Sequence, residues 1–166
     1  MVQIRSELPS DADAIEAVTV AAFRHAAHAS HTEQFIVRAL RDAGQLVVAL
    51  VAEEGGVIIG HVAVSPVTIA GISCGWYGLG PISVLPAHQG RGVGTLLMQD
   101  GLARLRALGA AGCVVLGEPG YYRRFGFTAS SLALSGVPPE YFLAVSFDGP
   151  IPSGTVEYHA SFAATA

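Results

Sequence analysis

Three segments of the chain carry apolar residues at the spacing of one face of an α-helix. Apolar positions three and four residues apart lie on the same side of a helix. This spacing predicts helices over residues 11–24, 32–44 and 92–108. Their apolar positions are, in chain order, Ile15, Val18, Ala22, Phe23, Ile36, Val37, Leu40, Val93, Leu96, Leu97, Leu105 and Leu108. Ser10 with Asp13 resembles a capping box for the first helix, and Thr32 is a candidate cap for the second.

Uninterrupted apolar runs between these helices predict strands. Residues 46–53 and 57–64 flank Glu54-Gly55-Gly56, and two apolar runs joined by a glycine turn are typical of a β-hairpin. The other expected elements are strands over residues 2–5, 76–84, 113–116, 132–134 and 155–162, and a short helix over residues 121–125. A length of 166 residues suits one domain. We therefore expect a single α/β domain over residues 1–166, with helices on both faces of a mixed sheet.

The composition narrows the class of protein. Hydrophobic residues make up 51% of the chain and charged residues 13%, which excludes a disordered or highly charged tail protein. A net charge of −4 argues against nucleic-acid binding. Residues 55–90 contain no charged side chain, but glycines and prolines interrupt this stretch repeatedly. A membrane helix needs about 20 continuous apolar residues, so we expect buried strands here and no membrane span.

The two cysteines and the first residues favour a reducing compartment. Cys74 and Cys113 both lie in apolar surroundings, and we interpret them as two buried thiols rather than a disulfide. The sequence begins without the apolar core of a signal peptide. We predict a cytoplasmic protein.

The most informative segment is a glycine-rich turn that leads from a strand into a helix. It reads Gln89-Gly90-Arg91-Gly92-Val93-Gly94 and follows the apolar strand ending at Val84. The first-turn amides of a helix lack partners and carry the positive end of the helix dipole, and glycines let a ligand approach the backbone. Together they suit a pyrophosphate, to which Arg91 adds positive charge.

Spacing separates this turn from two other phosphate-binding motifs. A Walker A loop requires a lysine, and this chain has none. A Rossmann fingerprint requires a third glycine where Leu97 stands. A strand followed by Gln-x-x-Gly-x-Gly at a helix start resembles motif A of the GNAT N-acetyltransferase family.

A second segment extends this resemblance to GNAT proteins. Gly117-Glu-Pro-Gly-Tyr-Tyr-Arg-Arg-Phe-Gly-Phe127 is similar to motif B of the family. The chain is also similar to the YhbS-like branch in four further segments: Thr32-Glu33 to Leu40-Arg41, Gly60-His61-Val62-Ala63, Leu79-Gly80-Pro81 and Val156-Glu-Tyr-His159. The resemblance implies the GNAT fold, a mostly antiparallel mixed sheet in which two central strands splay apart.

The resemblance also implies a coenzyme and the residues that hold it. Acetyl-CoA would lie between the splayed strands as a co-substrate, with no metal. Ile82, Ser83 and Val84 would hold the pantetheine arm, chiefly through the main chain of Ile82 and Val84. An amide near Leu79 or Gly80 would bind the thioester oxygen. The pyrophosphate would lie on Gln89, Gly90, Arg91, Gly92, Val93, Gly94 and Thr95.

The resemblance implies an acid but leaves the base open. Tyr122 matches the tyrosine that often protonates the departing thiolate, or stabilises it by a hydrogen bond. Histone-acetylating members carry a glutamate where this chain has Gly78. Glu33, His31 and Glu118 are the remaining candidates, water could mediate the transfer, and a neutral amine would need no base. For Glu33 a favourable interaction with the helix dipole is the simpler role.

The histidines do not form a good metal set. His25, His28 and His31 are three residues apart, so they would point in different directions on a helix, and no cysteine or acid completes the set. We predict no metal site, and expect these histidines to flank the groove for the acceptor. His61, within an apolar run, is expected to be a hydrogen-bonded core residue.

Three functions remain for comparison. The first is an acetyl-CoA-dependent transfer of an acetyl group to a primary amine of a small molecule, peptide or protein, by direct attack in a ternary complex. The second is an acyl-CoA sensor without turnover, and the third a nucleotide-binding subdomain of the Rossmann type. The partner of the first is an amine whose identity the sequence does not give, and a homodimer is compatible with it.

Overall fold

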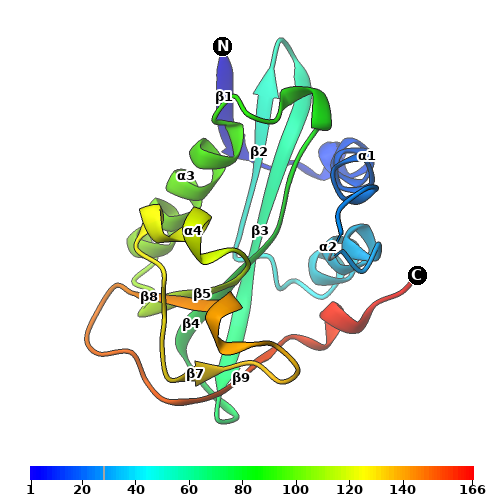
Figure 1. Cartoon of the computed structure of the whole chain (residues 1–166). Coiled ribbons are helices and arrows are strands. Elements are labelled where there is room, and N and C mark those ends of the chain that lie inside the picture. Colours follow the sequence, from blue (N-terminus) through cyan, green and yellow to red (C-terminus); the bar gives the residue numbers. More distant parts are fainter. Residues whose placement is uncertain (28) are drawn as a thin grey trace.

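The computed structural model describes residues 1–27 and 29–166. A curved sheet runs through the middle of the molecule, with α1 (Ala12–Phe23) and α2 (Glu33–Asp42) on one side. Helix α3 (Val93–Ala107) and the short helix α4 (Pro119–Tyr122) lie on the other side (Figure 1). Helices on both faces of a mixed sheet confirm the expected class of fold. Among the described residues, no helix has both the length and the apolar character needed to cross a membrane.

Nine strands form the sheet of the described chain. They are β1 (Val2–Ser6), β2 (Val48–Glu54), β3 (Val57–Ile69), β4 (Ile72–Val84), β5 (Gly112–Leu116), β6 (Thr128–Ala129), β7 (Leu132–Ala133), β8 (Phe142–Ser146) and β9 (Gly154–Tyr158). Their order is β1-β2-β3-β4-β5-β8-β6, and β9 pairs with both β3 and β7. Short 3-10 turns connect several elements: η1 (Pro9–Asp11), η2 (Pro86–His88), η3 (Arg123–Phe125), η4 (Pro139–Tyr141) and η5 (Ala160–Ala163).

The central strands β4 and β5 are parallel and pair only briefly. Their register is Trp76 with Gly112, Tyr77 with Cys113 and Gly78 with Val114. Pairing stops there although β4 continues to Val84. The expected splay between two central strands is therefore confirmed, and its apex lies at Gly78.

An extra residue in β4 sets which side chains face α3. Val62 of β3 pairs with Ile82, but Val64 pairs with Leu79, so the register shifts by one residue at Gly80 and Pro81. Because neighbouring strand residues face opposite sides, a bulge of one residue reverses the alternation. Leu79, Ile82 and Val84 consequently all pack in the core beneath α3.

The core has a separate part on each side of the sheet. Beneath α3, Leu97, Met98 and Leu105 pack on the apolar faces of the central strands. On the opposite side, Trp76 and Phe142 lie in a second cluster that also includes residues of β3 and β9. A third cluster joins α1 and α2 to β2, so helices are packed on both faces of the sheet.

The strands predicted from apolar runs are confirmed, with longer bounds for β3 and β4. Strand β8 is an addition, since no apolar run in residues 142–146 was singled out from the sequence. It pairs with β5 along the whole of that strand, from Gly112 with Ser146 to Leu116 with Phe142. The predicted 155–162 strand ends earlier, and η5 follows it.

Several helical details predicted from spacing are wrong. Leu96 and Leu108 are 41% and 59% exposed, because the buried face of α3 runs instead through Leu97, Met98 and Leu102. The acid that caps the first helical segment is Asp11 and not Asp13: its Oδ2 accepts a hydrogen bond of 2.7 Å from the Leu8 amide.

The start of α2 also differs from the expected cap. Thr32 occupies the cap position but makes no side-chain capping bond. Glu33 instead accepts hydrogen bonds through Oε2 from the amide and hydroxyl of Ser30, at 2.9 and 3.0 Å. Its place in the first helical turn fits the predicted structural role.

The prediction of two buried thiols holds for one cysteine only. Cys113 is fully buried in β5, whereas Cys74 is exposed. Cys74 lies near the turn that joins β3 to β4, where β4 extends beyond its first pair with β5 at Trp76. The apolar neighbours of Cys74 in sequence therefore do not enclose it.

Glu7 links the end of β1 to α2 and β3. It accepts hydrogen bonds from Arg41 Nε at 2.7 Å and pairs with His61 Nε2 at 2.8 Å. His61 is completely buried, which confirms it as a hydrogen-bonded core residue. Burial alone would raise the pKa of Glu7, but the hydrogen bonds from His61 and Arg41 outweigh it and lower this pKa to about 2.

Replacing Glu7 with glutamine is expected to lower the free energy of unfolding at pH 7 by about 2–3 kcal/mol. A carboxyl with a lowered folded-state pKa stabilises the fold above its unfolded value of 4.5, and this stability is lost as the pH falls from 4.5 towards 2. Urea unfolding of both proteins at pH 7 and pH 3 measures the effect. We expect the difference between them to shrink at pH 3, and an equal difference at both pH values would contradict the assignment.

Candidate active site

Within the described part of the chain, the turn between β4 and α3 leaves a row of main-chain amides without partners. Gly90 and Gly92 have φ of +76° and +82°, in the left-handed region where glycine is favoured. The Leu96 amide is the first to bond back into the helix, to the Gly92 oxygen at 3.1 Å. No side chain of the described residues caps α3. The amides of Val93, Gly94 and Thr95 are thus directed out of the helix end.

The approach to this turn is open. A side chain built at Gly90 or Gly92 would meet no atom within 4 Å. Gln89 holds the turn against β4, because its Nε2 donates to the Val84 oxygen at 3.0 Å. The predicted Gln89 therefore has a visible structural role, and its bond occupies one main-chain group expected for the pantetheine arm.

Arg91 lies in an ion pair with the β2–β3 hairpin. Its Nη2 is 2.8 Å from Glu54 Oε2, and its Nη1 is 2.6 Å from His88 Nδ1. The hydrogen bond from Arg91 lowers the pKa of Glu54. A phosphate held by Arg91 would have to compete with this surface carboxylate, or share the guanidinium with it.

Ile82, Ser83 and Val84, the β4 residues predicted to hold the pantetheine arm, have side chains on opposite sides of the sheet. The side chains of Ile82 and Val84 pack against the core beneath α3. Ser83 is buried on the other side, and its Oγ finds no hydrogen-bond partner among the residues described. The main chain of all three lies beyond the last β4–β5 pair, where the edge facing β5 is not used by the sheet.

Tyr121 and Tyr122 of α4 lie on the same side of the sheet as α3 (Figure 1). The Tyr121 hydroxyl is 3.2 Å from the position of a Cβ at Gly94, so it borders the first turn of α3. A Cβ at Gly117 would overlap the ring of Tyr122. The rings of Tyr121 and Tyr122 meet edge to face, with centroids 4.9 Å apart. Tyr122 is thereby packed against the end of β5.

The predicted acid is a partly buried phenol. Burial, followed by the neighbouring Tyr121, raises the pKa of Tyr122 to about 12. Its hydroxyl is therefore protonated at neutral pH. It can donate a hydrogen bond, but it cannot act as a base.

The candidate bases do not converge on the splay. Gly78 is confirmed at its apex and offers no side chain. Glu118 and His31 are exposed, and Glu33 bonds to Ser30. His28 lies outside the described residues, so the expected His25, His28 and His31 group is not tested as a whole. The described residues hold no cluster of three or more metal-binding side chains.

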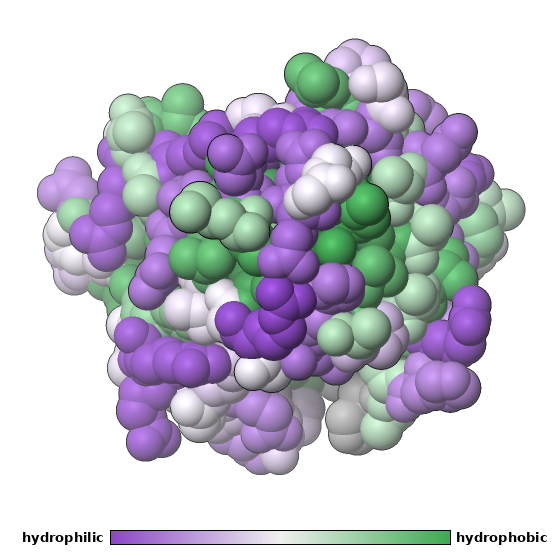
Figure 2. All heavy atoms as spheres, turned by 90° about the horizontal axis from the view of Figure 1, so that it is seen from above, coloured by the Kyte–Doolittle hydropathy of each residue, from purple (hydrophilic) through white to green (hydrophobic). Residues whose placement is uncertain are grey.

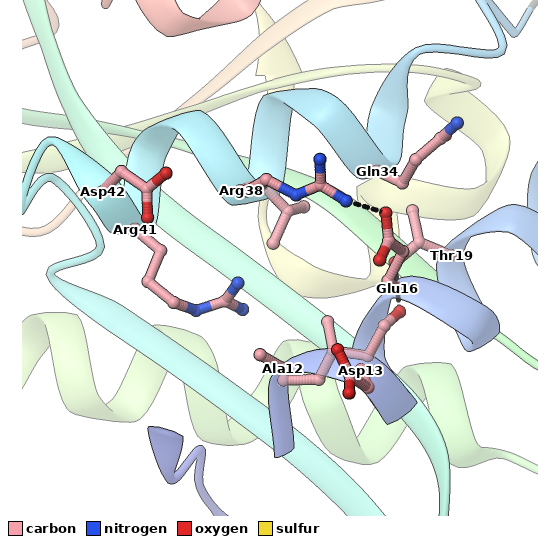
Figure 3. Close-up of a pocket in the computed structure, with 10 residues that line it drawn as sticks. Ala12, Asp13, Glu16, Thr19, Gln34, Arg38, Arg41 and Asp42 are labelled. Carbon is pink, nitrogen blue, oxygen red and sulfur yellow. Dashed lines mark hydrogen bonds and ion pairs between the residues drawn. The ribbon is translucent and has the colours of Figure 1, made fainter. Parts of the chain in front are cut away.

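A surface pocket of about 170 Å³ lies elsewhere, between α1 and α2. Figure 3 shows its lining, in which the ion pair of Arg38 with Glu16 bridges the two helices. None of its lining residues belongs to β4, α3 or α4. On the face seen from above, hydrophilic and hydrophobic residues are interspersed (Figure 2). The site of interest is therefore the splay itself rather than this pocket.

Comparison with known proteins decides the family. Residues 45–129, which include the glycine turn and α4, match the family described as Acetyltransferase (GNAT) domain. The chain is 39% identical to the N-acetyltransferase YhbS of Escherichia coli (strain K12) over 125 residues, which are 75% of this chain and 72% of YhbS. The chain belongs to the GNAT acetyltransferase family.

Two solved GNAT structures are similar over nearly their whole length. A GNAT acetyltransferase from Brucella melitensis, in complex with acetyl-CoA, is 52% identical with a TM-score of 0.89, covering 98% of each chain. Escherichia coli YhbS, in complex with CoA, is 33% identical with a TM-score of 0.87, covering 99% of this chain and 93% of that one. These likenesses confirm the predicted fold and the resemblance to YhbS.

Two contacts in this GNAT site were not predicted from the sequence. Tyr121 borders the start of α3, although only Tyr122 had been given a role. Tyr158 of β9 lies over Gly78, with its Cε2 atom 2.7 Å from the position of a Cβ there. Tyr158 is far from Gly78 in sequence, and only the pairing of β9 with β3 brings it to the apex.

Proposed function

We propose that this protein is an N-acetyltransferase that binds acetyl-CoA in the splay between β4 and β5 and transfers the acetyl group to a primary amine. The observation that carries the proposal is the row of unpaired amides at the start of α3, next to strands that separate at Gly78. Such a helix end binds phosphate groups through its amides and its dipole. The acetyl-CoA and CoA complexes of the two similar proteins support the same ligand here.

The residues of the splay suit the parts of this ligand in order. Gln89, Gly90, Arg91, Gly92, Val93, Gly94 and Thr95 would hold the pyrophosphate. The main chain of Ile82, Ser83 and Val84 would pair with the pantetheine arm, as a strand does at an open sheet edge. The thioester would then lie near the apex, between Leu79 and Tyr122.

The Leu79 amide is the candidate donor to the thioester oxygen. Burial raises the pKa of the Cys113 thiol, and the Leu79 amide opposes this as a hydrogen-bond donor. The amide therefore lies next to the β5 thiol, and it would donate to the thioester oxygen together with or in place of Cys113 Sγ. A donor in this place would stabilise negative charge that develops on the oxygen during attack.

Tyr122 would stabilise the leaving thiolate by a hydrogen bond. An ordinary thiol has a pKa of about 8.5, whereas the pKa of Tyr122 is about 12. Complete proton transfer from Tyr122 to the thiolate is therefore uphill. The proton that the amine loses during attack is the net source of the thiol proton of CoA.

No carboxylate is proposed as the base. The amine would enter neutral and attack directly, with the enzyme supplying orientation between two bound partners. The reaction balances as one amine and acetyl-CoA giving one amide and CoA. We infer a ternary complex because neither cysteine is suited to carry the acetyl group. Cys113 is fully buried and its pKa is raised, and the exposed Cys74 lies near the β3–β4 turn, before the first pair of β4 with β5 at Trp76.

The proposed function is tested by amine-dependent release of CoA. Acetyl-CoA is incubated with the protein and with polyamines, aminoglycosides, amino acids and peptides with free N-termini, and free thiol and acetylated product are both measured. We expect product with at least one class, and initial-rate lines that intersect when both substrates are varied. Parallel lines would contradict a ternary complex. Binding of acetyl-CoA without turnover on any amine would instead identify a sensor.

A further inference from the structure

Gly78 is a glycine because an aromatic ring occupies the space of its side chain. A Cβ at this position would lie 2.7 Å from Cε2 and 3.1 Å from Cζ of Tyr158. The φ of Gly78 is not positive, so the backbone does not require glycine there. The ring of Tyr158 thus lies directly on the strand at the apex of the splay.

The surroundings of Tyr158 hold this ring in place. Tyr158 pairs with Val67 across β9 and β3. Its ring meets Phe162 edge to face, with centroids 4.7 Å apart. Phe162 belongs to η5, which packs against α2. Tyr158 therefore lies on the α1/α2 side of the sheet, opposite to α3 and α4.

The Tyr158 hydroxyl is near the reacting end of the splay. Burial raises the pKa of Tyr158, and the nearby Cys113 thiol and Tyr122 hydroxyl raise it further. No hydrogen bond among the described residues contributes to that pKa. Tyr122 and Tyr158 consequently approach the apex from opposite sides of the sheet, each with an available hydroxyl.

A second hydroxyl on the same side is buried and unpartnered. Ser65 of β3 pairs directly with Gly78 of β4, and paired residues of antiparallel strands face the same side. Ser65 is completely buried, and its Oγ finds no partner among the residues described. Buried hydroxyls normally have partners, so this group is suited to a ligand or a water molecule at the apex.

We propose that Tyr158 and Ser65 bind the acceptor amine on the α1/α2 side of Gly78. The inference rests on the proposed function. Their hydroxyl oxygens accept hydrogen bonds from the amine N–H groups, which directs the nitrogen lone pair across the apex to the thioester carbon. The C–N bond forms first and the C=O electron pair moves onto the thioester oxygen; this pair then re-forms the C=O bond as the C–S bond breaks. Tyr122 donates a hydrogen bond to the departing sulfur from the other side, and the proton lost by the amine becomes the thiol proton of CoA. Two neutral hydroxyls accept hydrogen bonds without adding charge, so they favour the neutral form of a primary amine.

The test uses hydroxylamine as the acceptor, because it is a small nucleophile that is neutral at pH 8. Release of CoA is measured at saturating acetyl-CoA with hydroxylamine varied, and the rate without protein is subtracted at each concentration, because hydroxylamine also cleaves thioesters by itself. Losing one neutral hydrogen bond corresponds to a change of about fivefold to tenfold. Tyr158→Phe is expected to raise the KM for hydroxylamine by this factor, with kcat and the Kd of acetyl-CoA unchanged. Tyr141→Phe, at a tyrosine that is 38% exposed, is the matched control and should behave like the wild type.

Gly78→Ala displaces the ring while retaining the Tyr158 hydroxyl. It is expected to raise the same KM, and combining it with Tyr158→Phe should add little, because both changes remove one interaction. If Tyr158→Phe does not fold, as judged by circular dichroism, Ser65→Ala replaces it with the same expected rise in KM.

The outcomes separate this inference from the proposed function. If Tyr158→Phe had the same kcat and the same KM for hydroxylamine as the wild type, the proposed role of Tyr158 would be overturned. A decrease in kcat with an unchanged KM would overturn it as well. Absence of hydroxylamine- and amine-dependent CoA release by the wild type would overturn the proposed function together with this inference. If Tyr158→Phe raised the KM for acetyl-CoA and not the KM for hydroxylamine, Tyr158 would bind the coenzyme, and the inference that it binds the amine would be contradicted.

Discussion

Replacing Tyr122 with phenylalanine is expected to lower kcat for amine acetylation by about a hundredfold, because a positioned hydrogen-bond donor to developing charge contributes about this much or more. The change removes the hydroxyl that would stabilise the thiolate and keeps the ring that packs against Gly117. The Kd of acetyl-CoA should remain unchanged, because the donor acts on a charge that exists only during the reaction. Steady-state kinetics and calorimetric titration with acetyl-CoA measure the two quantities.

The pH dependence provides the control for Tyr122. Its pKa of about 12 means that Tyr122 remains protonated as the pH rises from 7 to 10, so its titration should cause no fall in kcat over this range. Tyr141→Phe serves again as the exposed tyrosine control. If Tyr122→Phe retained wild-type kcat, or mainly weakened acetyl-CoA binding, Tyr122 would be a packing residue only.

Replacing Thr95 with glutamate is expected to weaken acetyl-CoA binding by about a hundredfold, corresponding to a repulsion of about 2–3 kcal/mol between close charges in a partly solvated site. Thr95 is in the first turn of α3. An acidic side chain there is favourable for the helix itself, so the fold should retain its stability while the pyrophosphate is repelled. The Kd is measured by calorimetry, and the melting temperature is measured without ligand.

Thr95→Gln is the matched control, since glutamine has the shape of glutamate without its charge. We expect it to lose much less affinity than Thr95→Glu, and the difference should decrease as salt is added, because salt screens exposed charges. Equal affinities of the two variants would place the pyrophosphate away from the start of α3.

The sequence was sufficient for the parts of the site that are local along the chain. Gln89 to Thr95 form one turn and one helix start, so glycine spacing and the preceding apolar run predicted their arrangement. Tyr122 followed from the resemblance of residues 117–127 to motif B of the GNAT family, a segment that comes directly after β5. The splay was predicted from the resemblance to GNAT proteins. In that family the strand before motif A and the strand before motif B separate, and both motifs can be located in the sequence.

Features that depend on pairing between distant segments could not be predicted. Tyr158 reaches Gly78 only because β9 pairs with β3, and nothing near either residue indicates this contact. The exposure of Cys74 depends on how far β4 extends beyond its neighbour β5. The pairing of Arg91 with Glu54 likewise joins a helix start to a hairpin turn, which local spacing does not encode.

Leu96 and Leu108, at α3, were wrongly predicted to be buried for a different reason. Leu96 and Leu108 are apolar and lie near the predicted stripe, but helical periodicity assigns a face only to within about one neighbouring position. Gly101 and Leu102 lie on the buried face instead. Tertiary packing therefore decided between candidate faces that the spacing alone left nearly equal.

The central claim is that the amides at the start of α3 bind the diphosphate of acetyl-CoA, and NMR titration of these amides tests it most directly. In ¹⁵N–¹H spectra, glycine amides are separated from most others, so Gly90, Gly92 and Gly94 can be followed as acetyl-CoA is added. The account predicts saturable downfield shifts of the Gly92 and Gly94 amide protons, as expected when they donate to phosphate oxygens. Saturable binding that leaves these amides unmoved while others shift, or no binding at all, would contradict it.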